Sequence, residues 1–89
     1  MRIYELTPKI YDHVKSFYGK AQVIEEDNGT KSLKSYNTIV CRLTPQGEIV
    51  RTWGGYSVTS MRHINTFLDL FNIPGGDKAW WDKLEVKEG

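Results

Sequence analysis

The chain has 89 residues, the length of one small domain, and its 39% hydrophobic and 26% charged residues are typical of a folded protein, so we treat residues 1–89 as one globular unit. Twelve Lys and Arg against eleven Asp and Glu give a formal net charge of +1. That charge argues both against a protein that coats nucleic acid through a strong basic field and against an acidic nucleic-acid mimic.

The single cysteine, Cys41, excludes an internal disulfide framework and a cysteine-based zinc finger. Cys41 lies in an apolar run, which predicts a buried structural thiol. No apolar stretch is long enough to span a membrane, and the N-terminal residues show no apolar leader. We therefore expect a cytoplasmic protein that does not bind a membrane.

The first predicted element is a helix over residues 8–18. Thr7 suits its N-cap, Pro8 its first position and Gly19 its end. Apolar side chains recur at helical spacing on one arc of this segment, and His13 falls on the opposite, polar arc.

Two turn signals then predict two hairpins. The dipeptide Asn28-Gly29 favours a two-residue type I′ turn, which would pair Glu26 with Lys31 and Ile24 with Leu33. Residues 44–47 (Thr-Pro-Gln-Gly) favour a type I turn followed by a bulge. In that register the expected pairs are Leu43 with Ile49, Cys41 with Arg51 and Ile39 with Trp53. The two hairpins share a middle strand, so three strands in meander order are expected.

Arg51 is the one charge on the otherwise apolar face of this predicted sheet. Because an unpaired buried charge is very costly, we expect Arg51 either to reach the sheet edge or to pair with an acid, Glu48 or Asp69. The opposite face, which includes Val40 and Arg42, is expected to be half-exposed.

Two helices complete the expected fold. One spans roughly residues 60–71, capped by Ser57 or Thr59, and a short one follows Asp77 through Lys83. The predicted class is therefore α+β: a three-stranded antiparallel meander packed with two amphipathic helices, plus a short C-terminal helix, in the order α-β-β-β-α-α. The first two helices are expected on one face of the sheet.

No catalytic signature is present. His13 and His63 fall on different predicted helices, and neither has a nearby Cys, Asp or Glu at metal-ligand spacing. We expect no catalytic residues, no metal site and no cofactor.

Residues 54–63 form the first candidate site, for an anion or a partner, through Ser57, Thr59, Arg62 and His63. The segment combines a glycine pair, three hydroxyls and two basic side chains at the start of a helix. The alternative is that it is only a loop and a helix cap. On a helical wheel Arg62 points to the centre of the polar arc, whereas His63 lies in the apolar arc. We therefore expect His63 to be partly buried and hydrogen-bonded to the strand or loop, and Arg62 to be available to an anion or an acidic partner.

Three aromatic residues form the second candidate site: Tyr56, Trp80 and Trp81 could anchor a partner. The alternative for the tryptophan pair is structural, with one ring in the core and the other covering its edge.

Three strings carry a resemblance: Ser-Phe-Tyr-Gly-Lys-Ala at 16–21, Leu-x-Ser-Tyr-x-Thr-x-Val at 33–40 and Ser-x-Thr-x-x-Arg-His-Ile-x-x-Phe at 57–67. The chain resembles a family of short uncharacterised proteins from phages, plasmids and integrative elements of Gram-positive gut bacteria. The resemblance spans residues 16–67, with Ser60 where members commonly have a second threonine. It implies an origin on a mobile element and no mechanism.

Our hypothesis from the sequence is a non-enzymatic accessory protein that binds a protein partner, such as a component of a host defence that targets nucleic acid, and inhibits it. The alternative is a small nucleic-acid-binding module that uses Arg42, Arg62, nearby lysines and aromatic stacking. An enzyme with an unrecognised site is a third reading, disfavoured because no acid–base or nucleophile–base pair can be named. The sequence leaves open whether the protein is a monomer or a homodimer.

Overall fold

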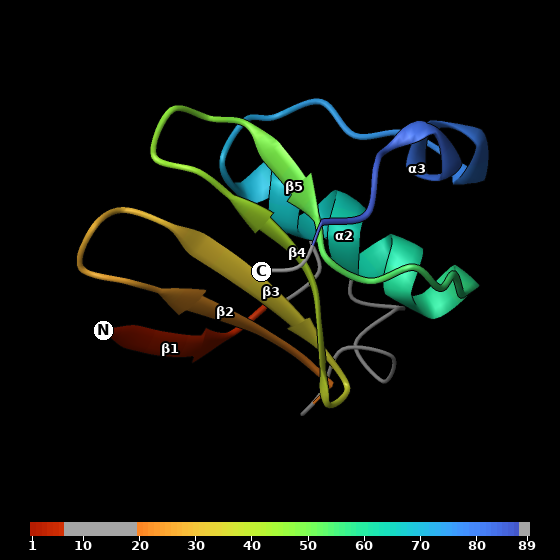
Figure 1. Cartoon of the computed structure of the whole chain (residues 1–89). Coiled ribbons are helices and arrows are strands. Elements are labelled where there is room, and N and C mark those ends of the chain that lie inside the picture. The colour runs from red at the N-terminus through yellow and green to blue at the C-terminus, as the bar shows by residue number, and fades with distance from the viewer. Residues whose placement is uncertain (7–19, 88–89) are drawn as a thin grey trace.

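The computed structural model describes residues 1–6 and 20–87, and these residues form one antiparallel sheet with two helices packed against it (Figure 1). The strands are β1 (Arg2–Glu5), β2 (Ala21–Glu25), β3 (Lys31–Ser35), β4 (Thr38–Leu43) and β5 (Ile49–Arg51), and they lie side by side in chain order. The helices are α2 (Val58–Leu70) and α3 (Lys78–Lys83). The helix predicted over residues 8–18, including His13, lies outside the described residues.

The expected three-stranded meander is wrong, because the sheet has five strands and a strand comes first. The sequence analysis did not assign residues 2–5 to an element, since four residues are too few to show a periodicity. They pair along their whole length with β2, with Tyr4 opposite Val23. The order of the described elements is therefore β-β-β-β-β-α-α.

The fifth strand arises because the predicted middle strand is two strands. A tight turn at Tyr36 and Asn37 separates β3 from β4, and Ser35 stands opposite Thr38 across it. Tyr36 has a positive φ of 57°. Such turns normally place glycine, asparagine or aspartate at this conformation, so a tyrosine there gives no turn signal in the sequence.

The first hairpin differs from its predicted register by one residue. Val23, and not Ile24, stands opposite Leu33. The Gly29 N–H donates to the Glu26 carbonyl at 3.0 Å, and the φ of Gly29 is 94°. This is a type I turn closed by a glycine bulge, which adds one residue to the expected two-residue loop. The shift turns the side chain of Val23 into the core, because successive residues of a strand face opposite sides.

The second hairpin confirms its prediction near the turn. Leu43 stands opposite Ile49 and Cys41 opposite Arg51, and Gly47 has the left-handed φ expected of the bulge, 87°. The expected pairing of Ile39 with Trp53 is wrong, since β5 ends at Arg51.

Val40 is buried, which corrects the expectation that it lies on a half-exposed face. The ladder between β3 and β4 shifts register beside it, and the N–H groups of both Thr52 and Trp53 donate to the Val40 carbonyl. The extra residue in β4 brings Val40 inward together with Cys41.

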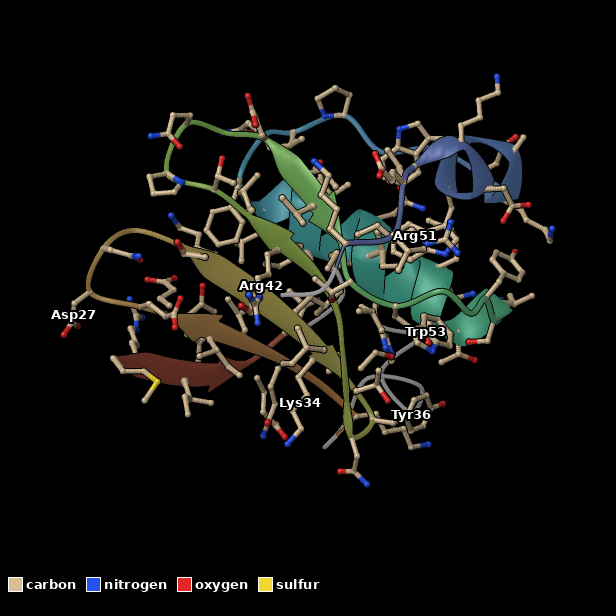
Figure 2. The ribbon with its side chains drawn as sticks, viewed as in Figure 1. Asp27, Lys34, Tyr36, Arg42, Arg51 and Trp53 are labelled. Carbon is tan, nitrogen blue, oxygen red and sulfur yellow. The ribbon has the colours of Figure 1, made fainter. Side chains whose placement is uncertain are left out.

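The register divides the side chains of the sheet between two faces. Tyr4, Val23, Leu33, Cys41 and Arg51 form a row toward the helices, and the next row along the strands, formed by Ile3, Ile24, Ser32, Arg42 and Val50, points away from them. Figure 2 shows Lys34 and Arg42 on this second face. Helix α2 lies across the first face (Figure 1) and buries Met61, Ile64, Phe67 and Leu68 there.

Candidate partner-binding surface

Arg51 organises the loop that leads from the sheet into α2. Its side chain is buried, and within residues 1–6 and 20–87 it donates hydrogen bonds to main-chain carbonyls. Nε reaches the carbonyl of Trp53 at 2.8 Å, Nη1 that of Trp81 at 2.7 Å and that of Leu84 at 3.4 Å, and Nη2 that of Gly55 at 3.3 Å. The guanidinium carbon also lies 4.4 Å from the centre of the Trp81 ring. One side chain thus joins three stretches of chain.

The side chain of Arg51 is buried instead of reaching solvent at the sheet edge, and the partners described above are carbonyls instead of the expected acid. The physical reason is that the five N–H donors of a guanidinium can be satisfied by carbonyls, and the loop and the end of a short helix supply carbonyls within reach.

The segment after α3 covers the outer edge of β5. Val86 forms a parallel bridge with Arg51, and the Lys87 N–H donates to the Arg51 carbonyl at 2.7 Å. In addition, the indole N–H of Trp81 donates to the Gly55 carbonyl at 2.9 Å. The loop before α2 is consequently held by β5 on one side and by α3 on the other.

Gly55 is sterically required in this loop. A Cβ at position 55 would lie 2.5 Å from Cζ2 of Trp53, whereas a Cβ at Gly54 would meet only Val86, at 3.8 Å. We expect Gly55→Ala to lower the free energy of unfolding by about 1–3 kcal/mol, because the Trp53 ring must move. Gly54→Ala is the matched control, with a change within about 0.5 kcal/mol. Urea denaturation of both variants checks this, and equal midpoints would contradict it.

The loop and the start of α2 form one end of the molecule together with the β3–β4 turn. Figure 2 shows Tyr36 and Trp53 at this end. Val58 and Arg62 are one helical turn apart and so lie on one side of α2. We call this group the aromatic end, and its members are Tyr36, Trp53, Tyr56, Val58 and Arg62. Tyr36 is 49% exposed, Tyr56 37% and Val58 59%, and Arg62 is exposed as well.

A buried polar cluster fixes the turn against the helix. The Ser35 hydroxyl lies 2.8 Å from Nδ1 of His63 and 2.9 Å from the Ser60 hydroxyl. All three side chains are buried. The ring of Tyr36 stands next to this cluster, with its centre 5.9 Å from that of His63. The cluster therefore sets the position of Tyr36 relative to α2.

The predicted site residues near α2 have different environments. Ser57 is the N-cap, because its hydroxyl accepts from the Ser60 N–H at 3.0 Å, and Thr59 is half-buried. His63 is fully buried, more than the partial burial expected, and its ring contacts Ser35 of β3, while Arg62 is exposed. Of the predicted anion or partner site, the structure therefore leaves Arg62 and parts of Ser57 and Thr59 at the surface.

The three predicted aromatic candidates also separate. Trp81 is fully buried in the core, and Trp80 is half-buried beside it, with the ring centres 6.2 Å apart. This is the structural alternative for the pair. Tyr56 is exposed, and the Lys78 ammonium lies 5.4 Å from the centre of its ring.

Sequence reasoning missed Tyr36 and Ser35 as members of this region. Both belong to the Ser-Tyr-x-Thr string. A polar residue inside a strand and a tyrosine without apolar neighbours do not, however, indicate a turn or a binding surface in a sequence. Arg42 and Arg62, the cations of the nucleic-acid alternative, are not brought together. Arg42 belongs to the sheet face turned away from the helices, whereas Arg62 lies on α2.

Comparison with protein families gives one match. Residues 4–83 match the model of a family of unknown function, DUF8033. The match covers most of the chain, and the chain belongs to this family. Comparison with curated proteins and with solved structures gave no match.

Two further properties concern the described residues alone. None of the helices in residues 1–6 and 20–87 is both long and apolar enough to cross a membrane. Within the same residues, no three His, Cys, Asp or Glu side chains gather in a way that could hold a metal ion.

Proposed function

We propose that this chain is a non-enzymatic accessory protein of a mobile genetic element that acts by binding a protein partner through the aromatic end. The observation that carries the proposal is the conformation of Tyr36, a bulky residue with a φ of 57° whose ring is half-exposed. The resemblance to phage and plasmid proteins favours a host protein as the partner, such as a component of a defence that targets nucleic acid.

The backbone conformation of Tyr36 raises the free energy of the folded state, and burial of its ring offsets only part of that increase. An L-residue in the left-handed region costs roughly 1–2 kcal/mol relative to the right-handed one. Glycine would avoid that cost, and a ring that is 49% exposed gains only part of the stabilisation of a buried one. A strained, exposed aromatic side chain is the kind of feature that function, and not folding, retains.

The composition of the aromatic end fits protein recognition. Tyrosine, tryptophan and arginine are the residues that most often dominate the binding energy of interfaces. Here Tyr36, Tyr56 and the apolar side chain of Val58 are exposed, and the exposed Arg62 supplies a positive charge. The matching partner surface would present an apolar pocket bordered by acidic groups.

The test compares Tyr36→Gly with the unchanged protein. We expect Tyr36→Gly to keep a free energy of unfolding within about 1 kcal/mol of the wild type or above it, because glycine removes the backbone strain. We expect affinity for the partner, first captured from host lysate and then purified, to fall by roughly tenfold or more. Isothermal titration calorimetry and thermal denaturation provide the two readouts.

Leu70→Ala is the matched control, because Leu70 is 48% exposed on α2 but lies at the helix end far from the aromatic end. It should leave affinity unchanged. The proposal is wrong if Tyr36→Gly binds as tightly as the wild type. If the captured partner is a nucleic acid instead of a protein, and its binding constant falls steeply as the salt concentration rises, the nucleic-acid alternative is favoured.

A further inference from the structure

The two edges of the sheet differ in whether a neighbouring segment pairs with them. The outer edge of β5 is covered by the C-terminal segment, through the bridge between Arg51 and Val86. On the other edge, β1 pairs with β2 on one side, and no strand within residues 1–6 and 20–87 pairs with its other side. An uncovered edge presents backbone donors and acceptors that can pair with another chain.

The hydrogen bonds between β1 and β2 show which backbone groups of β1 point away from the sheet. The Leu6 N–H donates to the Ala21 carbonyl of β2 at 2.9 Å. In an antiparallel ladder the direction alternates from residue to residue, so the backbones of Arg2 and Tyr4 also turn toward β2. The N–H and C=O groups of Ile3 and Glu5 therefore point away from the sheet.

The side chain at this edge is apolar. Ile3 is 57% exposed, and it stands opposite the half-buried Ile24 on the face turned away from the helices. Natural edge strands usually carry lysine, proline or an inward charge that discourages pairing. Ile3 shows the reverse of that pattern, because its side chain is apolar and exposed and its backbone groups also point outward.

We propose that β1 pairs antiparallel with β1 of a second copy of this chain, about a two-fold axis at Ile3, so that the two five-stranded sheets become one. The two Ile3 residues would exchange both N–H···O=C bonds, and their side chains would pack together with Ile24 of each copy. The inference uses residues separate from the aromatic end, so it stands or falls independently of the proposed function.

Charge and polarity select Ile3 as the residue on the axis. A two-fold axis between copies of one strand places one residue opposite itself. An axis at Glu5 would oppose two carboxylates, and an axis at Tyr4 would oppose Ile3 to Glu5. With the axis at Ile3, Arg2 of one copy stands opposite Tyr4 of the other, a cation–ring pairing that also occurs within the chain, where the distance is 4.8 Å.

The self-complementary sequence favours a second copy over a foreign peptide as the occupant. The strand offers the same four residues, Arg-Ile-Tyr-Glu, to its own copy, with opposed residues that are apolar with apolar and cation with ring. No other segment need be supplied for the ladder to form.

Sedimentation velocity of the full chain tests the proposal. The wild type should sediment as a dimer that dissociates on dilution. Ile3→Pro removes only an outward N–H and leaves the bonds to β2, because proline is tolerated at such edge positions. Ile3→Lys places a like charge opposite itself. Both variants should be monomers at concentrations where the wild type is dimeric, with circular dichroism like that of the wild type. A wild type that is monomeric, or a dimer that Ile3→Lys leaves intact, would overturn the proposal.

Cysteine cross-linking tests the register and remains informative if Ile3→Pro does not fold. Ile3→Cys should form an intermolecular disulfide under mild oxidation, because position 3 faces itself. Glu5→Cys, on the same face, should not. The native thiol does not interfere, since Cys41 is buried and burial raises its pKa to about 12. Cross-linking at position 5 that equals or exceeds that at position 3 would refute the register.

Discussion

Arg51→Met is expected to lower the free energy of unfolding by about 3 kcal/mol or more, because the hydrogen bonds from one charged side chain to four carbonyls would be lost at once. The variant keeps an apolar side chain of similar length but leaves the carbonyls of Trp53, Gly55 and Trp81 without the guanidinium. A hydrogen bond in which one partner is charged contributes about 1.5–3 kcal/mol. The loss should be read from urea denaturation followed by fluorescence of the three tryptophans.

Arg51→Lys should fall between the wild type and the methionine variant. A lysine keeps the charge but cannot direct donors at both the loop and the end of α3, since its ammonium is a single point on a flexible stem. Arg62→Met is the matched control, because Arg62 is exposed. The free energy of unfolding of this variant should differ from that of the wild type by less than about 0.5 kcal/mol. If Arg51→Met and Arg62→Met unfold at the same urea concentration, Arg51 does not hold the loop and α3 to the sheet.

His63→Ala is expected to cost about 2–4 kcal/mol of stability. The substitution opens a cavity at a fully buried position and removes one of the two partners of the Ser35 hydroxyl. The neighbouring Arg62→Ala should leave stability within about 0.5 kcal/mol, because that side chain is exposed. Thermal denaturation of the two variants, measured side by side, gives the comparison.

The same pair of variants also separates structure from recognition. Affinity for the partner should fall in Arg62→Ala while the protein stays folded, since Arg62 belongs to the aromatic end. If the Arg62→Ala protein binds its partner normally, Arg62 is not part of the binding surface. If it unfolds, the start of α2 is only a helix cap. If His63→Ala is as stable as the wild type, the buried cluster does not position the turn.

The elements that local chemistry specifies were predictable from the sequence. Pro45 and Gly47 define the second hairpin almost alone, so its turn and its first two pairs are confirmed. The wheel position of His63 predicted its burial, because an apolar arc identifies the buried face of a helix. Asn28-Gly29 located the first hairpin, but the dipeptide is compatible with two loop lengths, and the register was therefore wrong by one residue.

The features that depend on distant contacts were not predictable. Four residues at the start of the chain form a strand only because β2 is there to pair with them. Tyr36 carries no turn signal, so the division of the middle strand and the aromatic end itself were missed. The acceptors of Arg51 include the carbonyls of Trp81 and Leu84, 30 and 33 residues further along the chain, and no spacing in the sequence connects them.

The strand order has a consequence for how the protein folds. Each strand pairs with its neighbour in the chain, so the ladders from β2 to β5 can form by closing tight turns, a local process that is fast. Residues 84–87 reach β5 only through contacts that span more than thirty residues, and they cover an edge that is already complete. We therefore expect their docking to follow formation of the sheet, and their release to be a local opening that bares the β5 edge while the sheet persists.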